Sequence, residues 1–230
     1  MKILEILQEF AASFCDKVPE SKDFTVLFQI TGQNESYTVQ VKEGAANILE
    51  ERPEGEYFIC ETTEDCLQQI YRGELTAFTA SAKGLVSDSA PLDWKLDRFD
   101  PRQMEDEMKD LYFFIMHFFH TSEPEKIQLQ EEFARRIHGG KAVPLFYDPG
   151  FRSSWYVLNK GEQLNEPGEH DPWDQGIIII KGEGRAKIGD RTVDIKKNEA
   201  YYLPPNQDQV IWNEQTEPLE LIWLAWGTGA

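Results

Sequence analysis

Hydrophobic residues along the chain recur first at helical spacing and then at strand spacing. Between residues 2 and 15 they share one helical face, which predicts an amphipathic helix. From residue 24 the period changes to two, which is the spacing of half-buried strands. We expect strands over residues 24–30, 37–41, 46–49 and 57–61. Gly32 and the polar residues around it predict a hairpin loop between the first two strands.

Two shorter helices are expected after these strands. Thr62, with Asp65 three residues later, predicts a capped helix that ends at Gly73. A helix of small residues follows over residues 75–82. Short extended segments are then expected at residues 85–87 and 92–96.

A long helix is predicted from Pro101 to about His120, because proline favours the first turn of a helix. Its second half, residues 111–119, is almost wholly apolar, and a helix that is apolar all round is normally buried on several sides. We therefore expect it to dock between two modules or in a subunit interface; a lid facing lipid is the less favoured interpretation. His117 and His120 are expected at the edge of a core, without partners nearby.

The order of these elements resembles the sterol carrier protein domain over about residues 5–100. The motifs that carry the resemblance are Glu61-Thr62-Thr63-Glu64-Asp65, Gly73-Glu74-Leu75-Thr76-Ala77-Phe78 and Ala82-Lys83-Gly84-Leu85-Val86-Ser87-Asp88. Such domains lay helices over one face of a five-stranded sheet and hold a lipid or another hydrophobic small molecule. The resemblance implies such a site at Leu67, Ile70 and Phe78. Apolar residues at helical spacing more often fill a core, and that interpretation is favoured.

The rest of the chain changes character after a predicted second helix that runs to Ile137. From His138 onwards the pattern alternates as strands to the end of the chain. The sequence therefore predicts an α+β module over residues 1–120, a helical connector over 121–138 and an all-β module over 139–230.

The stretch from Gly176 to Asn213 has the frame of a small antiparallel barrel. A run of isoleucines ends at Gly182, and the later strands follow Asn198-Glu199 and contain Pro204-Pro205. With these residues the third segment resembles a cupin, a double-stranded β-helix that forms a jelly-roll barrel. The resemblance implies two motifs whose histidines and carboxylate hold a metal.

The residues at the metal positions depart from that pattern. Counted by the family spacing, these positions hold Glu169, Asp171, Gln175 and Gln209. His170 is one residue out of register and on a strand would point to the other face. A redox metal needs two or more imidazoles, whereas an oxygen-rich set suits Mg²⁺, Mn²⁺ or Ca²⁺. We favour a pocket without a metal; the alternative is a divalent metal held by these four residues and His170.

Aromatic residues surround the same stretch, and those that face inward would form a stacking box for a small organic ligand. We expect ligand contacts from Trp173, Gln175, Tyr202, Gln209 and Trp212. Trp223 and Trp226, on the last strand, are candidates for a homodimer surface, because an edge strand needs covering.

Charge and cysteine content narrow the classes of function. The formal net charge of −18 repels polyanions and argues against nucleic-acid binding. The three cysteines have no metal-ligand spacing, and an odd number argues against a disulfide framework. No apolar run is long enough to span a membrane, and the first residues do not suit a signal peptide. We expect a soluble cytoplasmic protein that does not insert into membranes.

These observations leave three hypotheses. The favoured one is a two-domain binding protein, non-enzymatic or weakly enzymatic and without a cofactor, with an apolar ligand in the first module and a small polar or aromatic ligand in the barrel. The second is a metal-dependent cupin enzyme, such as an isomerase, lyase or dioxygenase. The third is a sensor or assembly module in which the helix over residues 111–119 carries a signal between domains.

Overall fold

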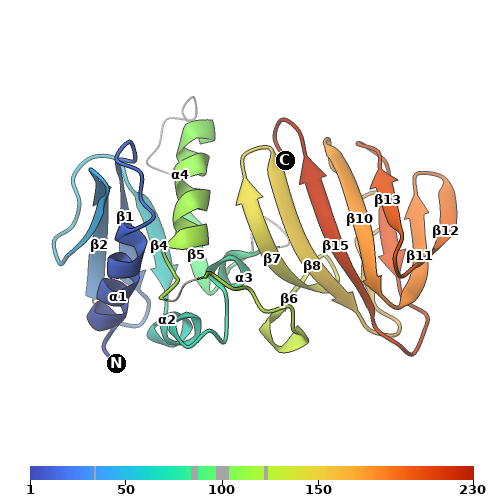
Figure 1. The fold of residues 1–230 in the computed structure, drawn as a ribbon, viewed down its shortest axis with the longest axis horizontal. Coiled ribbons are helices and arrows are strands. Elements are labelled where there is room, and N and C mark those ends of the chain that lie inside the picture. Colours follow the sequence, from blue (N-terminus) through green and yellow to red (C-terminus); the bar gives the residue numbers. More distant parts are fainter. Residues whose placement is uncertain (34, 84–87, 97–103, 122–123) are drawn as a thin grey trace. The chain divides into compact units, whose positions relative to one another are not determined.

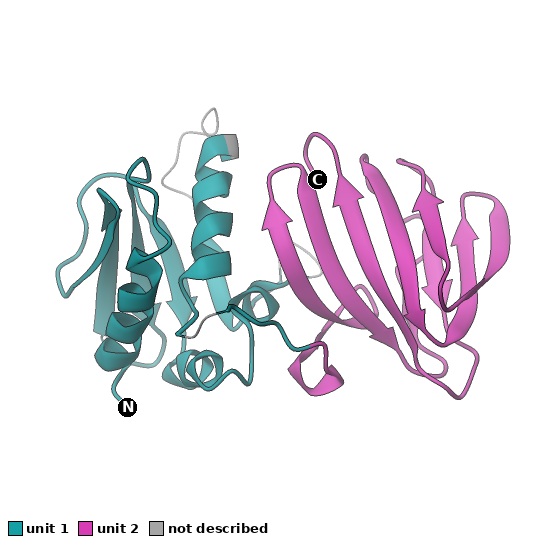
Figure 2. Cartoon of the chain, in the orientation of Figure 1, with its two compact units in different colours: residues 1–128 teal, residues 129–230 magenta. Residues whose placement is uncertain are grey.

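The computed structural model describes the chain except for residues 34, 84–87, 97–103 and 122–123. It has two compact units, Met1–Gln128 (unit 1) and Leu129–Ala230 (unit 2), shown in Figure 2. The expected segment at residues 85–87 and the expected helix start at Pro101 lie outside the described residues. Among the helices that are described, none has the length and apolarity needed to cross a membrane.

Unit 1 is an α+β unit built on a five-stranded sheet of order β3-β2-β1-β4-β5. The strands are β1 (Phe24–Ile30), β2 (Glu35–Lys42), β3 (Ala45–Leu49), β4 (Phe58–Thr62) and β5 (Leu92–Lys95). The helices are α1 (Ile3–Cys15), α2 (Glu64–Tyr71), α3 (Ala77–Ser81) and α4 (Met104–His117). Strands β1 and β4 pair in parallel, and the other neighbours are antiparallel. The predicted α+β class and the five-stranded sheet are confirmed.

The cap of α2 is one residue later than the sequence predicts. Thr63, not Thr62, precedes the helix, and its hydroxyl accepts a hydrogen bond from the Cys66 backbone N–H at 3.2 Å. Thr62 is the last residue of β4, and its hydroxyl donates to the Pro91 carbonyl at 2.9 Å. From the sequence, either of the two adjacent threonines could cap the helix. Because Thr62 pairs within the sheet, Thr63 is the cap.

The apolar end of α4 packs inside unit 1. Phe114 and Phe118 stack at 4.3 Å between ring centroids, and both meet Phe14 of α1 and Phe28 of β1 edge-on or tilted. Helix α4 lies beside α1 and the sheet of unit 1 (Figure 1), and the phenylalanines of this segment pack there. The docking of the segment in an interface stays a prediction. The prediction of partnerless histidines is wrong for His117, whose Nδ1 lies 2.9 Å from a Glu125 carboxylate oxygen.

Unit 2 consists of two antiparallel sheets. The six-stranded sheet has the order β13-β10-β15-β8-β7-β6, and the four-stranded sheet has the order β12-β11-β14-β9. The strands are β6 (Arg135–Ile137), β7 (Gly140–Asp148), β8 (Phe151–Leu158), β9 (Gln163–Leu164), β10 (Asp174–Lys181), β11 (Glu183–Ile188), β12 (Arg191–Lys196), β13 (Ala200–Leu203), β14 (Gln209–Trp212) and β15 (Leu219–Trp226). The predicted helix up to Ile137 is absent from the described residues there, which form a 3₁₀ turn (η1, Glu131–Phe133) and β6.

A glycine with positive φ makes the turn from β10 to β11. Gly182 has φ +74°, and a Cβ built on it would lie 2.4 Å from the Pro218 carbonyl oxygen. No other residue fits this turn without moving backbone, which explains why the isoleucine run ends at this position.

Strand register places the inward-facing side chains of the large sheet in transverse rows. Along β10, Gln175 is 1% exposed and points into the barrel, whereas Ile178 is 41% exposed on the outer face. Register pairs Gln175 with Ala225, Ala225 with Arg152, and Arg152 with Tyr147. These four residues of β10, β15, β8 and β7 therefore form one row of the barrel interior.

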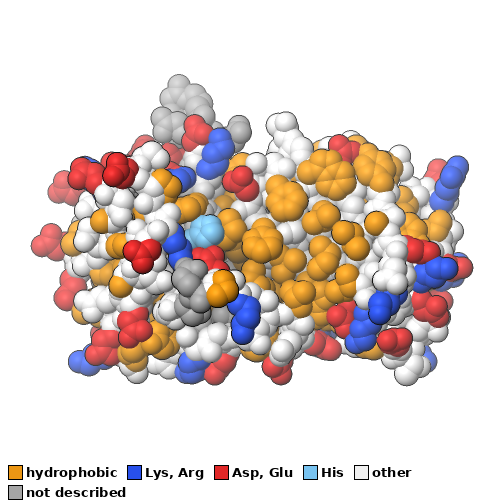
Figure 3. Space-filling model, in the orientation of Figure 1, with side chains coloured by type: hydrophobic (Ala, Val, Ile, Leu, Met, Phe, Trp, Pro, Cys, Tyr) orange, Lys and Arg blue, Asp and Glu red, His pale blue; other side chains and the backbone are white. Residues whose placement is uncertain are grey.

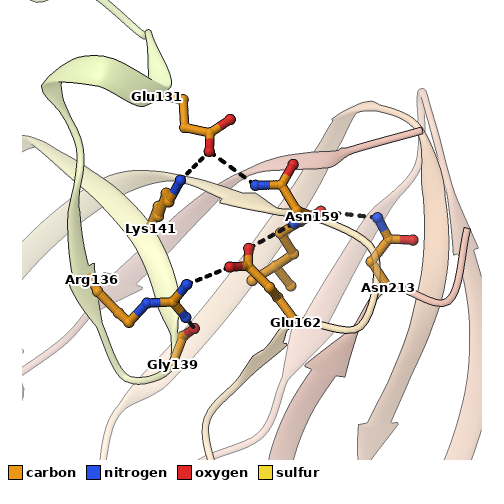
Figure 4. A network of polar contacts seen from close by, with 8 residues as sticks. Glu131, Arg136, Gly139, Lys141, Asn159, Glu162 and Asn213 are labelled. Atoms are coloured by element: carbon orange, nitrogen blue, oxygen red, sulfur yellow. Dashed lines mark hydrogen bonds and ion pairs between the residues drawn. The ribbon is translucent and has the colours of Figure 1, made fainter. Parts of the chain in front are cut away.

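A network of polar contacts lies at the Leu158 end of β8 (Figure 4). The Glu162 carboxylate accepts hydrogen bonds from the Asn159 backbone N–H at 2.8 Å and from the Arg136 guanidinium. Glu131 accepts from Lys141 and from the Asn159 side-chain amide. These contacts therefore link β6, β7 and the loop after β8 at the surface of unit 2.

Candidate functional site

Gln175 forms the centre of a polar cluster in the barrel interior. Its amide nitrogen donates to the Asp171 carboxylate at 3.0 Å, and its amide oxygen accepts from the Trp223 indole N–H at 2.5 Å. Trp223 faces inward from β15, in the row next to that of Gln175. The cluster fixes the Gln175 amide with its nitrogen toward the carboxylate, since only that orientation satisfies both partners.

Gln209 faces the interior from the opposite sheet, at the start of β14. It is 2% exposed, and its side-chain nitrogen has no hydrogen-bond partner among the described residues. Its backbone carbonyl accepts from the Asn165 side chain at 2.9 Å, which anchors the strand but not the Gln209 amide. A buried amide nitrogen without a partner is costly and rare, so this group is poised to donate to something else.

Arg152 lies in the same transverse row as Gln175, two strands away. Its guanidinium carbon is 5.8 Å from the centre of the Tyr147 ring and 5.2 Å from that of Trp173. The Nε atom of Arg152 and the Nε1 atom of Trp173 are both buried without a hydrogen-bond partner in the described part of the chain. This end of the barrel therefore presents a cation held between two aromatic rings, together with unused N–H donors.

Tyr156 lies two inward positions beyond Arg152 on β8 and is buried. Burial raises the pKa of its phenol above the ordinary value, and Tyr147 and Asp171 add to the effect. The hydroxyl therefore stays neutral at any physiological pH.

The loop before β10 separates the predicted metal residues. Asp171 is half-buried and reaches the interior through Gln175, as described above. Glu169 is exposed, and its carboxylate accepts from the Glu166 backbone N–H at 2.8 Å. His170 is exposed as well. The structure thus brings Asp171 and Gln175 together and leaves Glu169 and His170 outside with solvent.

The residues present do not fit the metal centre that the cupin resemblance implies. Among the residues that the structure describes, no three His, Cys, Asp or Glu side chains are grouped so as to hold a metal ion. The only carboxylate in the inner cluster, Asp171, is already hydrogen-bonded to Gln175, and the Gln175 oxygen is taken by Trp223. One carboxylate and two amides without an imidazole form a poor donor set for a transition metal.

Two of the predicted ligand contacts lie outside the barrel. Tyr202 is 55% exposed on β13, and its hydroxyl donates to the Asp174 carboxylate. Trp212 follows the inward-facing Ile211 on β14, so its side chain points outward. The guanidinium carbon of Arg185 lies 5.5 Å from the centre of the Trp212 ring. The structure therefore brings Trp173, Gln175 and Gln209 to the interior and separates them from Tyr202 and Trp212.

Trp212 instead lines a groove of about 420 Å³ on the outer face of the small sheet. Its walls are Gly161, Glu162, Gln163, Pro167, Lys187, Val210, Trp212, Asn213 and Glu214. The ammonium of Lys187 is paired with Asp208 at 2.6 Å, which lowers the pKa of that carboxyl. The positive charge of Lys187 is therefore already paired within the protein.

The two tryptophans predicted to form a dimer surface face opposite ways. Trp226 is 40% exposed on the outer face of the large sheet, close to Tyr202 at 6.3 Å between ring centroids. Trp223 points inward and is bound to Gln175, so its assignment to a dimer surface is wrong. Alternation along one strand requires this division, because residues 223 and 226 differ by an odd number.

The predicted lipid contacts of unit 1 are buried in its core. Leu67 and Ile70 lie on the buried face of α2, and Phe78 of α3 contacts Tyr112 of α4 at 6.4 Å between ring centroids. These positions suit core packing, which is the favoured interpretation from the sequence.

Sequence reasoning missed Arg152, the cation of the interior. The signal was available in the alternation of Arg152, Ser154 and Tyr156 on one strand, because all three share the inward face. A single arginine at an inward position of an apolar barrel strand is unusual enough to be noticed.

Comparison with known proteins places unit 2 in a recognised fold. Residues 154–225 match the family model of the cupin domain (Cupin_2), and no curated protein matches the chain. The match and the two-sheet topology confirm the predicted cupin fold, a double-stranded β-helix. The family match lies outside unit 1, so the sterol carrier resemblance gains no support from it.

Three solved structures that are similar to part of the chain are distant from it in sequence. A cupin 2 conserved barrel domain protein from Salinispora arenicola is 21% identical with a TM-score of 0.41, covering 46% of this chain and 91% of that one. The cupin domain of Cnp3 from Schizosaccharomyces pombe is 20% identical with a TM-score of 0.35, covering 38% and 60%. A predicted oxalate decarboxylase from Thermotoga maritima is 16% identical with a TM-score of 0.35, covering 38% and 79%.

Proposed function

We propose that the chain is a binding protein whose unit 2 takes a small polar or aromatic molecule inside the barrel. The observation that carries the proposal is the set of buried donors without partners on Arg152, Trp173 and Gln209. A barrel interior that served only as a core would satisfy such groups or replace them with apolar side chains. The aromatic rings of Tyr147 and Trp173 supply the flat apolar walls that small-molecule sites typically have.

This proposal predicts that interior and outer substitutions behave differently. A panel of small polar and aromatic compounds is screened for those that raise the unfolding midpoint of unit 2. Tryptophan fluorescence reports the unfolding. Gln209→Leu is expected to weaken every hit, because the ligand loses a donor, whereas Tyr202→Phe on the outer face leaves the hits unchanged. Hits that respond to Tyr202→Phe and ignore Gln209→Leu would place the ligand elsewhere and refute the proposal.

The metal-dependent enzyme remains the alternative, and metal content decides between them. The donor set around Gln175 gives no reason for tight metal binding, so we expect removal of metals with a chelator to leave the unfolding midpoint and ligand binding of unit 2 unchanged. A stoichiometric metal in the purified protein, with loss of the fold on its removal, would favour the enzyme instead.

For unit 1, the proposed hydrophobic ligand rests on the sterol carrier resemblance. Organic extraction of the purified protein, followed by mass spectrometry, tests it. A lipid recovered in near-stoichiometric amount would support it, and extracts that are consistently empty would leave Leu67, Ile70 and Phe78 as core residues only.

We also propose that a second copy of the chain covers the outer face of the large sheet. Figure 3 shows hydrophobic side chains gathered on this part of the surface. Its exposed apolar residues are Phe151, Ile178, Tyr202 and Trp226. Asp174 also lies on this face, where its carboxylate accepts a hydrogen bond from Tyr202. In a chain of net charge −18, a mainly apolar face is where two identical copies can approach with the least repulsion. Ile178→Lys is expected to convert a dimer into a monomer in sedimentation equilibrium; a wild-type monomer at high concentration would contradict this.

The cysteines support the proposed cytoplasmic location. Cys15, Cys60 and Cys66 are all free thiols, and burial raises the pKa of Cys60 well above its ordinary value. Free, buried thiols without a disulfide suit a reducing compartment. Fractionation of cells that produce the protein is the test, and recovery from an oxidising compartment would contradict it.

A further inference from the structure

The positive charge of Arg152 and its unpartnered N–H donor indicate which kind of molecule binds in the barrel. A guanidinium is always protonated, and its buried Nε–H lacks a hydrogen-bond partner among the described residues. The guanidinium carbon lies 5.8 Å from the centre of the Tyr147 ring and 5.2 Å from that of the Trp173 ring, and these ring contacts leave the Nε–H without an acceptor. Arg152 is half-buried, and the described residues supply it with aromatic contacts and no paired carboxylate.

The chain does not lack acids for this purpose. It has 41 aspartates and glutamates, and Asp171, the carboxylate of the inner cluster, accepts a hydrogen bond from Gln175. A second stacked arginine shows the ordinary arrangement: Arg185 covers Trp212 at 5.5 Å and is paired with Asp194 at 3.4 Å on the surface. Arg152 has the same stacking without the carboxylate, although it is the more buried of the two.

The other unpartnered groups of the interior are also hydrogen-bond donors. Trp173 offers an indole N–H, which can only donate, and the unpartnered atom of Gln209 is its amide nitrogen. The donors on Arg152, Trp173 and Gln209 therefore lack acceptors, and the Arg152 guanidinium adds a positive charge to this set. A carboxylate supplies both, because it is acceptor-only and can take two parallel N–H bonds from a guanidinium.

Resting on the proposed function, we infer that the ligand of unit 2 is a small organic acid whose carboxylate is bound by Arg152. Ala225 separates Arg152 from Gln175 in their row, so about 10 Å of sheet with one small side chain lies between the two polar groups. The rest of the molecule lies over Ala225, flanked by the Trp173 ring. A monoanion is favoured over a phosphate, because Asp171 and the acidic chain repel a second negative charge.

Matched acids and amides test this inference. Acetate, benzoate, acetamide, benzamide and inorganic phosphate are titrated into the full-length protein, and the side-chain N–H signals of Arg152 and Gln209 are followed by NMR. Acetate and benzoate are expected to shift the Arg152 signal saturably, and each amide is expected to bind at least about tenfold more weakly than its acid. Phosphate is expected to bind more weakly than either acid.

Variants of the two stacked arginines supply the control. Arg152→Gln is expected to abolish the preference for acids, and Arg152→Lys to weaken acid binding by about fivefold or more, since lysine keeps the charge but loses the planar fork. Arg185→Gln, on the outer face, leaves all titrations unchanged. Far-UV circular dichroism and the unfolding midpoint of each variant establish that it is folded.

The possible failures can be told apart. If acids and amides bind equally and Gln209→Leu weakens both, the inference is wrong while the proposed binding function stands. Tighter binding of phosphate than of acetate and benzoate overturns the assignment of a carboxylate. If no compound shifts either signal, both the inference and the proposed function are refuted.

Discussion

The interiors of the two units are built on different principles. In unit 1, aromatic rings from α1, α4 and β1 fill the space, and Phe114 and Phe118 each contact several others. In unit 2, the interior contains two buried glutamines and a half-buried arginine whose Nε atom is buried. The unpartnered buried atoms follow this division. The described ones are Asp93 Oδ1 in unit 1 and Arg152 Nε, Trp155 Nε1, Trp173 Nε1 and Gln209 Nε2 in unit 2.

The single exception in unit 1 is compensated. Asp93 Oδ1 lies 2.5 Å from the Lys83 ammonium, so an ion pair replaces the missing hydrogen bond. Unit 2 has no such compensation at Gln209 or Arg152 within the described residues. The comparison teaches that the aromatic core of unit 1 contributes stability, whereas the barrel interior keeps groups that destabilise the empty protein. Binding sites commonly carry that cost.

The largest expected effect is in the aromatic core. Phe118→Ala should destabilise unit 1 by about 3–5 kcal/mol, because the ring is fully buried and its loss leaves a cavity. Denaturant unfolding can follow the units separately. All four described α-helices belong to unit 1, so circular dichroism at 222 nm reports mainly on it. Tryptophan fluorescence reports mainly on unit 2, which holds Trp155, Trp173, Trp212, Trp223 and Trp226.

The two units should respond differently to that change. The fluorescence transition of unit 2 and its binding of ligands are expected to stay unchanged in Phe118→Ala. Phe118→Leu, which keeps most of the volume, should cost clearly less. Equal losses in both transitions would show that the two interiors are not independent.

A buried amide that is fully satisfied should also be costly to remove. Asn213, at the end of β14, is fully buried; it donates to the Leu158 and Glu217 carbonyls at 2.9 and 2.8 Å and accepts from the Gln215 N–H at 2.7 Å. Asn213→Leu removes all three hydrogen bonds and leaves buried backbone groups unpaired, so unit 2 should lose about 2–4 kcal/mol. The fluorescence-detected unfolding curve measures this, and a loss below about 1 kcal/mol would contradict it.

The buried amide of Gln209, at the start of β14, should behave in the opposite way. Gln209→Leu replaces a buried group whose amide nitrogen has no partner, so the ligand-free unit should gain about 0.5–1.5 kcal/mol. Asn213→Leu is the matched control, because it makes the same chemical change at a satisfied position. If both variants lose stability equally, Gln209 has a structural partner and the contrast between the units fails.

The smallest effect concerns pH. Burial alone would raise the pKa of Glu125, but hydrogen bonds from Lys17 and His117, with His120 nearby, outweigh it and lower the pKa below 4.5. A carboxyl whose pKa is lower in the folded state stabilises the fold above pH 4.5, and this contribution is lost as the pH falls through the folded value. Because the group is partly exposed, the contribution should stay below about 1 kcal/mol.

Glu125→Gln tests the sign of that effect. The variant should be less stable than the wild type at pH 7, and the difference should shrink as the pH falls below 4.5. The measurement is the circular dichroism transition of unit 1 as a function of pH. A difference that grows towards acid would contradict the assignment.

The sequence predicted the framework of both units, because periodicity depends on local spacing. The apolar run of β10 and the turn at Gly182 could be predicted from the chain. What failed depended on context. The helix predicted before Ile137 is replaced by strand pairing of β6 with β7.

The site was predicted in part for the same reason. Motif spacing gave Gln175 and Gln209 correctly as interior residues, since both lie on regular strands. Glu169 and His170 lie in a loop, where spacing says nothing about direction, and Trp212 has the outward phase on its strand. The sequence could not predict that the Arg152 Nε–H lacks a hydrogen-bond partner, because this depends on the position of every acidic side chain in the folded structure.

Affinity selection tests the central claim most directly, namely that the barrel interior is kept polar for a ligand. The full chain is equilibrated with a small-molecule cell extract, separated from free compounds and examined by native mass spectrometry beside Arg152→Gln. The wild type should retain an added mass that dissociates as an organic acid, and the variant should not retain it. The bare mass of the chain in every extract, or the same added mass in Arg152→Gln, would contradict the account.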